Sequence, residues 1–180
     1  MAGMTGQFGF YGKLPVRGDF VRRGLSEGVV SGWHEWICRN FAYARTAVAS
    51  EWEKGWLVAP VWRFSLPSGQ LTDMAVSGLV MPSVDKVGRY FPFLVCVEGE
   101  AVIPQNDMVW DEVELFCREA LMYDQDPEVL LARIQTLVPS AGEIPSDGMW
   151  FTEGNDSIPA QTLVCPGLPE QEAFVKLFWA

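Results

Sequence analysis

The stretch from Phe10 to Phe20 organises our interpretation of the sequence and reads Phe-Tyr-Gly-Lys-Leu-Pro-Val-Arg-Gly-Asp-Phe. A disordered N-terminus is poor in aromatic residues, whereas this stretch contains three. Gly12, Pro15 and Gly18 lie too close together for a plain strand. The stretch therefore predicts an anchored loop, with its rings buried and its charges held in place.

A second polar stretch, Pro82 to Pro92, reads Pro-Ser-Val-Asp-Lys-Val-Gly-Arg-Tyr-Phe-Pro. It separates two apolar runs, 74–81 and 93–97, which predict adjacent antiparallel strands with this loop at one end of the sheet. If the two polar loops meet, Arg17 and Arg89 are expected to share Asp85 or Asp19. An internal Asp85–Arg89 ion pair is the simpler interpretation, and such a pair fixes loop geometry more than it adds stability. Together the two stretches supply six candidate site residues: Lys13, Arg17, Asp19, Ser83, Asp85 and Arg89.

Three segments have helical periodicity. The first begins near Ser26 or Val29, with apolar residues three and four apart: Val29, Trp33, Trp36, Ile37, Phe41, Ala44 and Val48. The second follows Asn106 or Asp107 as its cap. The third begins at Asp126-Pro127 and is predicted to turn four residues inward: Val129, Leu130, Ile134 and Leu137.

Strand-like runs occur at 7–12, 56–59, 61–65, 149–151, 160–164 and 174–178, besides the two that flank the second polar stretch. The order of strands and helices predicts an α/β (or α+β) layered sandwich, with a mostly antiparallel or mixed central sheet flanked by helices. The chain of 180 residues is expected to form a single domain over 1–180.

The net charge of −10 argues against nucleic acid as a partner, because phosphates need a basic face. Residues 1–45 are net basic and residues 98–160 strongly acidic, so we expect a positive patch near the opening stretch and an acidic opposite half. No apolar run is long enough to insert into a membrane. Residues 1–6 lack the features of a secretory signal, which favours a cytoplasmic protein. The four cysteines are scattered and are expected to be small buried residues.

Motifs give an enzyme little support. The sequence has no glycine-rich phosphate loop ending in Lys-Ser/Thr. His34 is the only histidine and lies in an apolar helix, where we expect it to be partly exposed. A hydrolase that uses Ser83 or Asp85 remains an alternative, and it requires both residues to face a cleft. In the binding alternative, Lys13 and Arg17 present a basic recognition surface.

The two stretches together resemble the TagF (also called ImpM) family of bacterial type VI secretion system-associated proteins. The first signature is Tyr11-Gly12-Lys13-Leu14-Pro15-x-Arg17-Gly18-Asp19-Phe20-Val21, and the second is Pro82-Ser83-Val84-Asp85-x-Val87-Gly88-Arg89-x-Phe91-Pro92. The helix with Trp33 and Trp36 between them fits the family pattern. The resemblance is strong over residues 8–97.

This resemblance implies a non-enzymatic, cytoplasmic regulator that represses type VI secretion after translation. It implies binding to the forkhead-associated (FHA) scaffold protein of that system, apart from its threonine-phosphorylation switch. It brings no catalytic residues, cofactor or metal, and gives no oligomeric state. A structural adaptor for assembly of the system is the remaining alternative. It also implies a layered α/β fold, which agrees with the pattern of elements.

Overall fold

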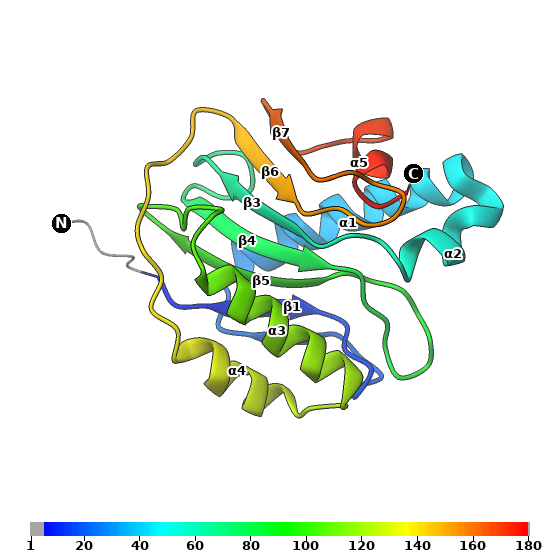
Figure 1. The fold of residues 1–180 in the computed structure, drawn as a ribbon, viewed down its shortest axis with the longest axis horizontal. Helices are drawn as coiled ribbons and strands as arrows, with labels where there is room; N and C mark the ends of the chain where they lie inside the picture. Colours follow the sequence, from blue (N-terminus) through cyan, green and yellow to red (C-terminus); the bar gives the residue numbers. More distant parts are fainter. Residues whose placement is uncertain (1–5, 180) are drawn as a thin grey trace.

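The computed structural model describes residues 6–179 and contains one seven-stranded sheet with helices on both faces (Figure 1). The strand order is β2-β1-β5-β4-β3-β6-β7, and every pair of neighbours is antiparallel. The strands are β1 (Gly9–Gly12), β2 (Val21–Arg23), β3 (Trp62–Leu66), β4 (Ala75–Met81), β5 (Phe93–Gly99), β6 (Gly148–Thr152) and β7 (Gln161–Cys165). The helices are α1 (Glu27–Val48), α2 (Trp52–Trp56), α3 (Val109–Met122), α4 (Pro127–Gln135) and α5 (Glu172–Phe178), with a 3-10 turn at Ala49–Glu51. The predicted α/β layered sandwich is confirmed.

The sheet separates two apolar cores. One lies under α1, α2 and α5 and contains indole and phenyl rings in contact with one another: Trp33, Trp36, Phe64 and Trp150. The other lies under α3 and α4 and is built around Trp110 and the buried faces of both helices. β4 is buried along its whole length because both of its faces are covered. Burial on both sides explains why its sequence is apolar rather than alternating.

The predicted helix starts are close to the observed ones. The Ser26 hydroxyl accepts a hydrogen bond from the Val29 N–H and caps α1. Asp126 caps α4, and Pro127 takes the first helical position. α3 begins at Val109, whose N–H donates to the Asp107 carboxylate at 2.9 Å. Asp107 therefore supports this helix from just outside its first turn.

Three expectations about local structure are wrong. Residues 56–59 are not a strand: α2 ends at Trp56 and a turn follows. Residues 174–178 belong to α5, whose buried residues Phe174, Leu177 and Phe178 have helical spacing. In α4, Leu130 and Ile134 are buried as expected, but Val129 is exposed. Short apolar runs fit a strand and a buried helix equally well, and packing against the rest of the chain decides between them.

The cysteines divide into two groups. Cys96 and Cys117 are buried as predicted, whereas Cys38 is exposed and Cys165 partly exposed. Cys38 lies on the outer side of α1, next to the inward-facing Ile37. The prediction about a secretory signal rests on residues 1–6, of which 1–5 lie outside the described residues. Within the part of the chain that is described, no helix is both long and apolar enough to span a bilayer.

Candidate functional site

The structure brings the two polar stretches together at one end of the sheet. The first loop, residues 13–20, connects β1 and β2, and the second, residues 82–92, connects β4 and β5. β1 pairs with β5, with Tyr11 opposite Leu94, so the first loop leaves the sheet beside the end of the second. The Lys86 N–H donates to the Arg17 carbonyl at 2.8 Å, and the Ser83 hydroxyl donates to the Lys13 carbonyl at 2.6 Å. We call these two segments the signature loops.

Asp85 is the centre of the contact between the loops. Its side chain is fully buried and accepts hydrogen bonds from the N–H groups of Val87 (3.0 Å) and Arg89 (2.9 Å). The Arg89 Nε donates to Asp85 Oδ2 at 2.7 Å, and the Lys13 Nζ lies 3.3 Å from the same oxygen. One carboxylate therefore holds its own loop closed and fixes Lys13 of the other loop.

The surroundings of Asp85 determine its charge. Burial raises the pKa of this carboxyl, but the hydrogen bonds from Arg89, Val87 and Lys13 outweigh burial and lower the pKa to about 2. Asp85 is therefore ionised at neutral pH. Its negative charge is matched by Lys13 and Arg89, so this end of the sheet holds a compensated buried charge rather than a free one.

Lys13 and Ser83 are buried and make contacts within the signature loops. Lys13 is buried, and its ammonium lies over the Phe20 ring, 5.0 Å from the centroid. Ser83 is buried between its bond to the Lys13 carbonyl and the bond that its own carbonyl accepts from Trp56 Nε1 at 2.9 Å. The expectation that Lys13 and Arg17 form a basic surface is therefore wrong for Lys13. Ser83 and Asp85 point into hydrogen bonds of the loops and not into a cleft.

The remaining candidate residues are on the surface. The Arg89 side chain is 60% exposed, and its guanidinium also donates to the Gly18 carbonyl. Arg17 pairs with Asp126 at the start of α4 at 3.2 Å, so the expected sharing of Asp85 or Asp19 by Arg17 is wrong, whereas the Asp85–Arg89 pair is present. Asp19 is exposed, and its carboxylate joins no ion pair among residues 6–179.

The basic and acidic parts of the chain are neighbours rather than opposite ends. Arg17 pairs with Asp126, and Arg23 pairs with Glu128 on α4. The positive charge of the opening stretch is thus partly balanced by acidic groups from 98–160, a contact that charge counts along the sequence cannot show. Lys86 and Arg89 are the basic side chains that the second loop exposes.

Aromatic side chains pack beneath the loops. The prediction that the rings of the first stretch are buried is correct for Phe10 and Tyr11 but wrong for Phe20, and the contacts among the rings were not predicted. Tyr11 stacks on Phe20, and Phe91 contacts both rings edge-on. The Tyr11 hydroxyl forms a hydrogen bond of 2.6 Å with His34 Nδ1, and the Cys38 thiol lies 3.3 Å from His34 Nε2. Burial, with the nearby Cys38, raises the pKa of Tyr11 to about 12. The four-residue spacing of His34 and Cys38 on one helix was the available signal for their contact.

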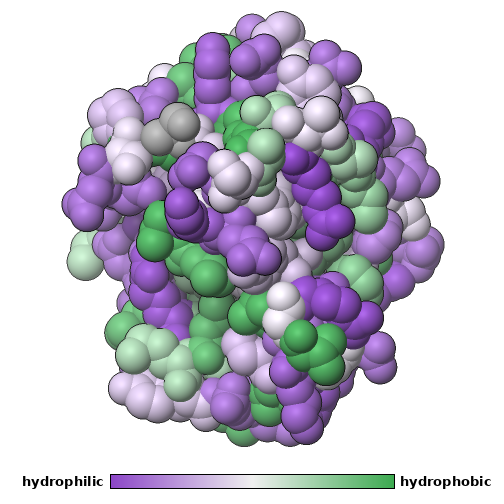
Figure 2. Space-filling model, turned by 90° about the vertical axis from the view of Figure 1, so that its right-hand side faces the viewer, coloured by the Kyte–Doolittle hydropathy of each residue, from purple (hydrophilic) through white to green (hydrophobic). Residues whose placement is uncertain are grey.

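Next to the second loop, the surface is hollowed and partly apolar. A cavity of about 410 Å³ lies between the end of α2, the end of α3 and Pro82, with Leu57, Val58, Leu121 and Met122 in its wall. Figure 2 views this end of the molecule and shows hydrophobic surface surrounded by polar side chains. Among residues 6–179, no group of three or more His, Cys, Asp or Glu side chains is arranged to hold a metal ion.

Comparison with known proteins places the chain in a family. The TagF N-terminal domain family, which is type VI secretion system-associated, matches residues 9–137. This range covers more than half of the chain and includes both signature loops, and the chain belongs to this family. β6 and β7 lie beyond the matched range, but they extend the same sheet from β3.

A solved structure is similar over nearly the whole chain. The crystal structure of PA0076 from Pseudomonas aeruginosa PAO1 has a TM-score of 0.81 and 28% sequence identity, over 96% of this chain and 94% of that chain. No curated protein matches the sequence. Because the similarity to PA0076 covers 96% of this chain, it extends beyond residue 137, where the family match ends.

Proposed function

We propose that this chain is a non-enzymatic, post-translational repressor of bacterial type VI secretion that acts in the cytoplasm by binding an FHA scaffold protein. The association with type VI secretion follows from the family. The repressor role and the FHA partner are what the resemblance of the signature loops implies. The observation that carries the proposal is that the loops are locked together through a buried Asp85, which leaves a preformed outer surface.

The outer surface of the loops has the composition of a protein-binding surface. Arg89 and Lys86 supply positive charge, and Phe20 (42% exposed) and Val87 (69% exposed) supply apolar area. Arginine and aromatic residues are enriched where proteins bind each other. Hydrogen bonds already fix the backbone of the loops. Binding a partner therefore costs little further conformational entropy of this backbone.

The positions of Ser83 and Asp85 favour binding over catalysis. A nucleophilic Ser83 needs a base within reach and an open approach, but its hydroxyl is used by the Lys13 carbonyl and is buried. A general base needs a pKa near the working pH, but that of Asp85 is lowered to about 2. The buried hydroxyl of Ser83 and the low pKa of Asp85 support the proposal that the loops form a binding surface and do not catalyse a reaction.

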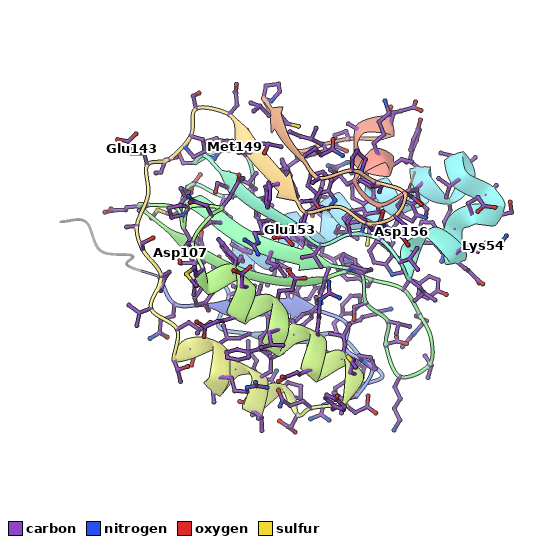
Figure 3. The ribbon with its side chains drawn as sticks, viewed as in Figure 1. Lys54, Asp107, Glu143, Met149, Glu153 and Asp156 are labelled. Carbon is purple, nitrogen blue, oxygen red and sulfur yellow. The ribbon has the colours of Figure 1, made fainter. Side chains whose placement is uncertain are left out.

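Deletion of the gene separates a repressor from an adaptor. We expect secretion of a type VI substrate to rise in the deletion strain and to return to its original level when the chain is restored. A fall in secretion on deletion would contradict the repressor proposal and favour the adaptor. Restoring the gene with Lys86→Glu tests whether repression depends on the outer surface of the signature loops, where Lys86 is exposed. Lys54→Glu on α2 is the control, since Lys54 is a 77% exposed lysine outside the signature loops (Figure 3).

A further inference from the structure

The two edges of the sheet differ in their protection. The β2 edge is three residues long and carries Arg22 and Arg23, which pair with Glu27 and Glu128. Short strands and charged side chains are the usual means by which proteins prevent a sheet edge from pairing with another chain. β7, at the other edge, has five residues, Gln-Thr-Leu-Val-Cys, without a charge, a proline or a glycine. This edge lacks the devices that protect the first one.

The region beside β7 is an open apolar groove. A cavity of about 660 Å³ lies between β7 and α5, with Leu163 and Cys165 of the strand and Ala173 of the helix in its wall. On the opposite face of the strand, Val164 is 62% exposed and lies opposite Met149 of β6. Figure 1 shows β7 and α5 together at this margin of the molecule. Both faces of β7 therefore expose apolar surface next to unpaired strand backbone.

Two charged residues beside this groove, Glu172 and Lys176, would pair with the same two residues of a second copy that runs in the opposite direction. Glu172 and Lys176 lie four residues apart on α5 and are neighbours on its surface, and Ala173 lines the same cavity with them. Both charged residues are exposed, and within residues 6–179 neither joins an ion pair. An antiparallel copy of α5 would place its Lys176 opposite Glu172 and its Glu172 opposite Lys176. The small Ala173 would allow the two helices to approach.

We propose that β7 pairs with β7 of a second copy of this chain, antiparallel and across a two-fold axis near Leu163. The two seven-stranded sheets then form one continuous sheet, and Thr162 lies opposite Val164 of the second copy. A two-fold axis perpendicular to the sheet reverses every direction parallel to the sheet. Because Glu172, Ala173 and Lys176 of α5 line the cavity beside β7, this pairing would bring the same side of the second α5 toward them in reversed direction. The complementary order of Glu172 and Lys176 favours a second copy over an unrelated strand.

This dimer has a consequence for the signature loops. The first loop joins β1 and β2, which lie at the far edge of the sheet from β7. Pairing through β7 therefore leaves both pairs of signature loops free at the two ends of the dimer. A dimer of this shape engages two partner molecules, or a dimeric partner with increased avidity. The dimer itself does not depend on the proposed function.

The first test is the mass of the purified chain in solution across the micromolar range, measured by light scattering and sedimentation equilibrium. We expect the mass to rise with concentration from 20.1 kDa to twice that value. Val164→Lys adds a charge to the edge and should hold the chain at the monomer mass. Val138→Lys is the matched control, since Val138 is 90% exposed and lies after α4. A wild-type monomer at every concentration, or equal behaviour of the two variants, would overturn the proposal.

The second test uses exposed charges, whose replacement leaves the fold intact. Lys176→Glu and Glu172→Lys should each weaken the dimer by about tenfold, because each variant faces like charges at two symmetric positions. An equimolar mixture of the two variants should form a heterodimer of wild-type strength, since every pair is then opposite in charge. Unchanged affinity in the single variants, or no recovery in the mixture, would exclude the antiparallel arrangement of α5.

Discussion

At the scale of single residues, Asp85 carries the connection between the signature loops. Removing the carboxylate leaves Lys13 with a buried ammonium and leaves two loop N–H groups without an acceptor. We expect Asp85→Ala to lower the free energy of unfolding by roughly 3–5 kcal/mol, the cost of breaking a buried ion pair from one side. Urea denaturation measures this change.

Asp19→Ala is the control for this prediction, because Asp19 belongs to the same loops but is exposed. Exposed substitutions of this kind change stability by about 0.5 kcal/mol or less. Equal stability of the Asp85 and Asp19 variants would show that the buried carboxylate does not hold the loops together.

The lowered pKa of Asp85 predicts a dependence of stability on pH. The pKa in the folded chain, about 2, is below the 3.8 of an unperturbed aspartic acid side chain. The ionised carboxylate therefore contributes stability that is fully present above pH 4 and is lost as the pH falls toward 2. We expect the wild-type chain to lose more stability than Asp85→Asn between pH 5 and pH 2.5, as measured by urea midpoints. Parallel curves for the two chains would contradict this assignment.

At the scale of elements, Gly12 controls how closely β1 approaches the start of β5. Its φ angle is +144°, and a Cβ atom there would lie 2.2 Å from the Pro92 carbonyl oxygen. We expect Gly12→Ala to lower the free energy of unfolding by about 2 kcal/mol or more, through backbone strain and separation of the strands. Thermal and urea denaturation measure the loss.

Gly18→Ala provides the matched comparison in the same loop. A Cβ atom at Gly18 meets no other atom within 4 Å, so this variant should be neutral or slightly stabilised. If Gly12→Ala were as stable as Gly18→Ala, the close approach of β1 to Pro92 would not be required for the fold.

The sequence predicted elements well where the local signal was long or chemically specific. α1 was found from its run of apolar residues and its Ser26 cap, and α4 from Asp126-Pro127. α5 was mistaken for a strand because five residues are too few to separate the two periodicities. The pairing of strands was predicted only in part. The sequence predicts the β4–β5 hairpin, because one short loop joins the two strands, but it does not predict that β3 pairs with β6.

The site was predicted less completely than the fold, for physical reasons. The Asp85–Arg89 pair is local in sequence and was foreseen, but the contacts of Lys13 with Asp85 and of Arg17 with Asp126 depend on how distant segments pack. Lys13 was expected on the surface because lysine is seldom buried without a partner. Here Asp85 and the face of Phe20 supply that partner.

At the scale of the whole molecule, the two surfaces for which we propose binding lie in different parts of the sheet. The signature loops lie with β1 and β5, where the family match is found, and the unprotected β7 edge lies on the other side. Substitutions in one region should therefore leave the other unaffected, since effects at distant sites are independent. We expect Val164→Lys to bind the partner through the loops with unchanged intrinsic affinity, measured by calorimetry per chain. A loss of affinity per site would show that the two regions are coupled.

The most direct test of the proposed function is co-purification of this chain with the FHA scaffold protein of the same secretion system. Wild type, Arg17→Glu with Lys86→Glu, and Lys54→Glu should be compared after circular dichroism shows that all are folded. We expect wild type and Lys54→Glu to retain the scaffold protein and the double variant to lose it. Absence of a complex with wild type would contradict scaffold binding, and retention by the double variant would show that the partner binds elsewhere than the signature loops.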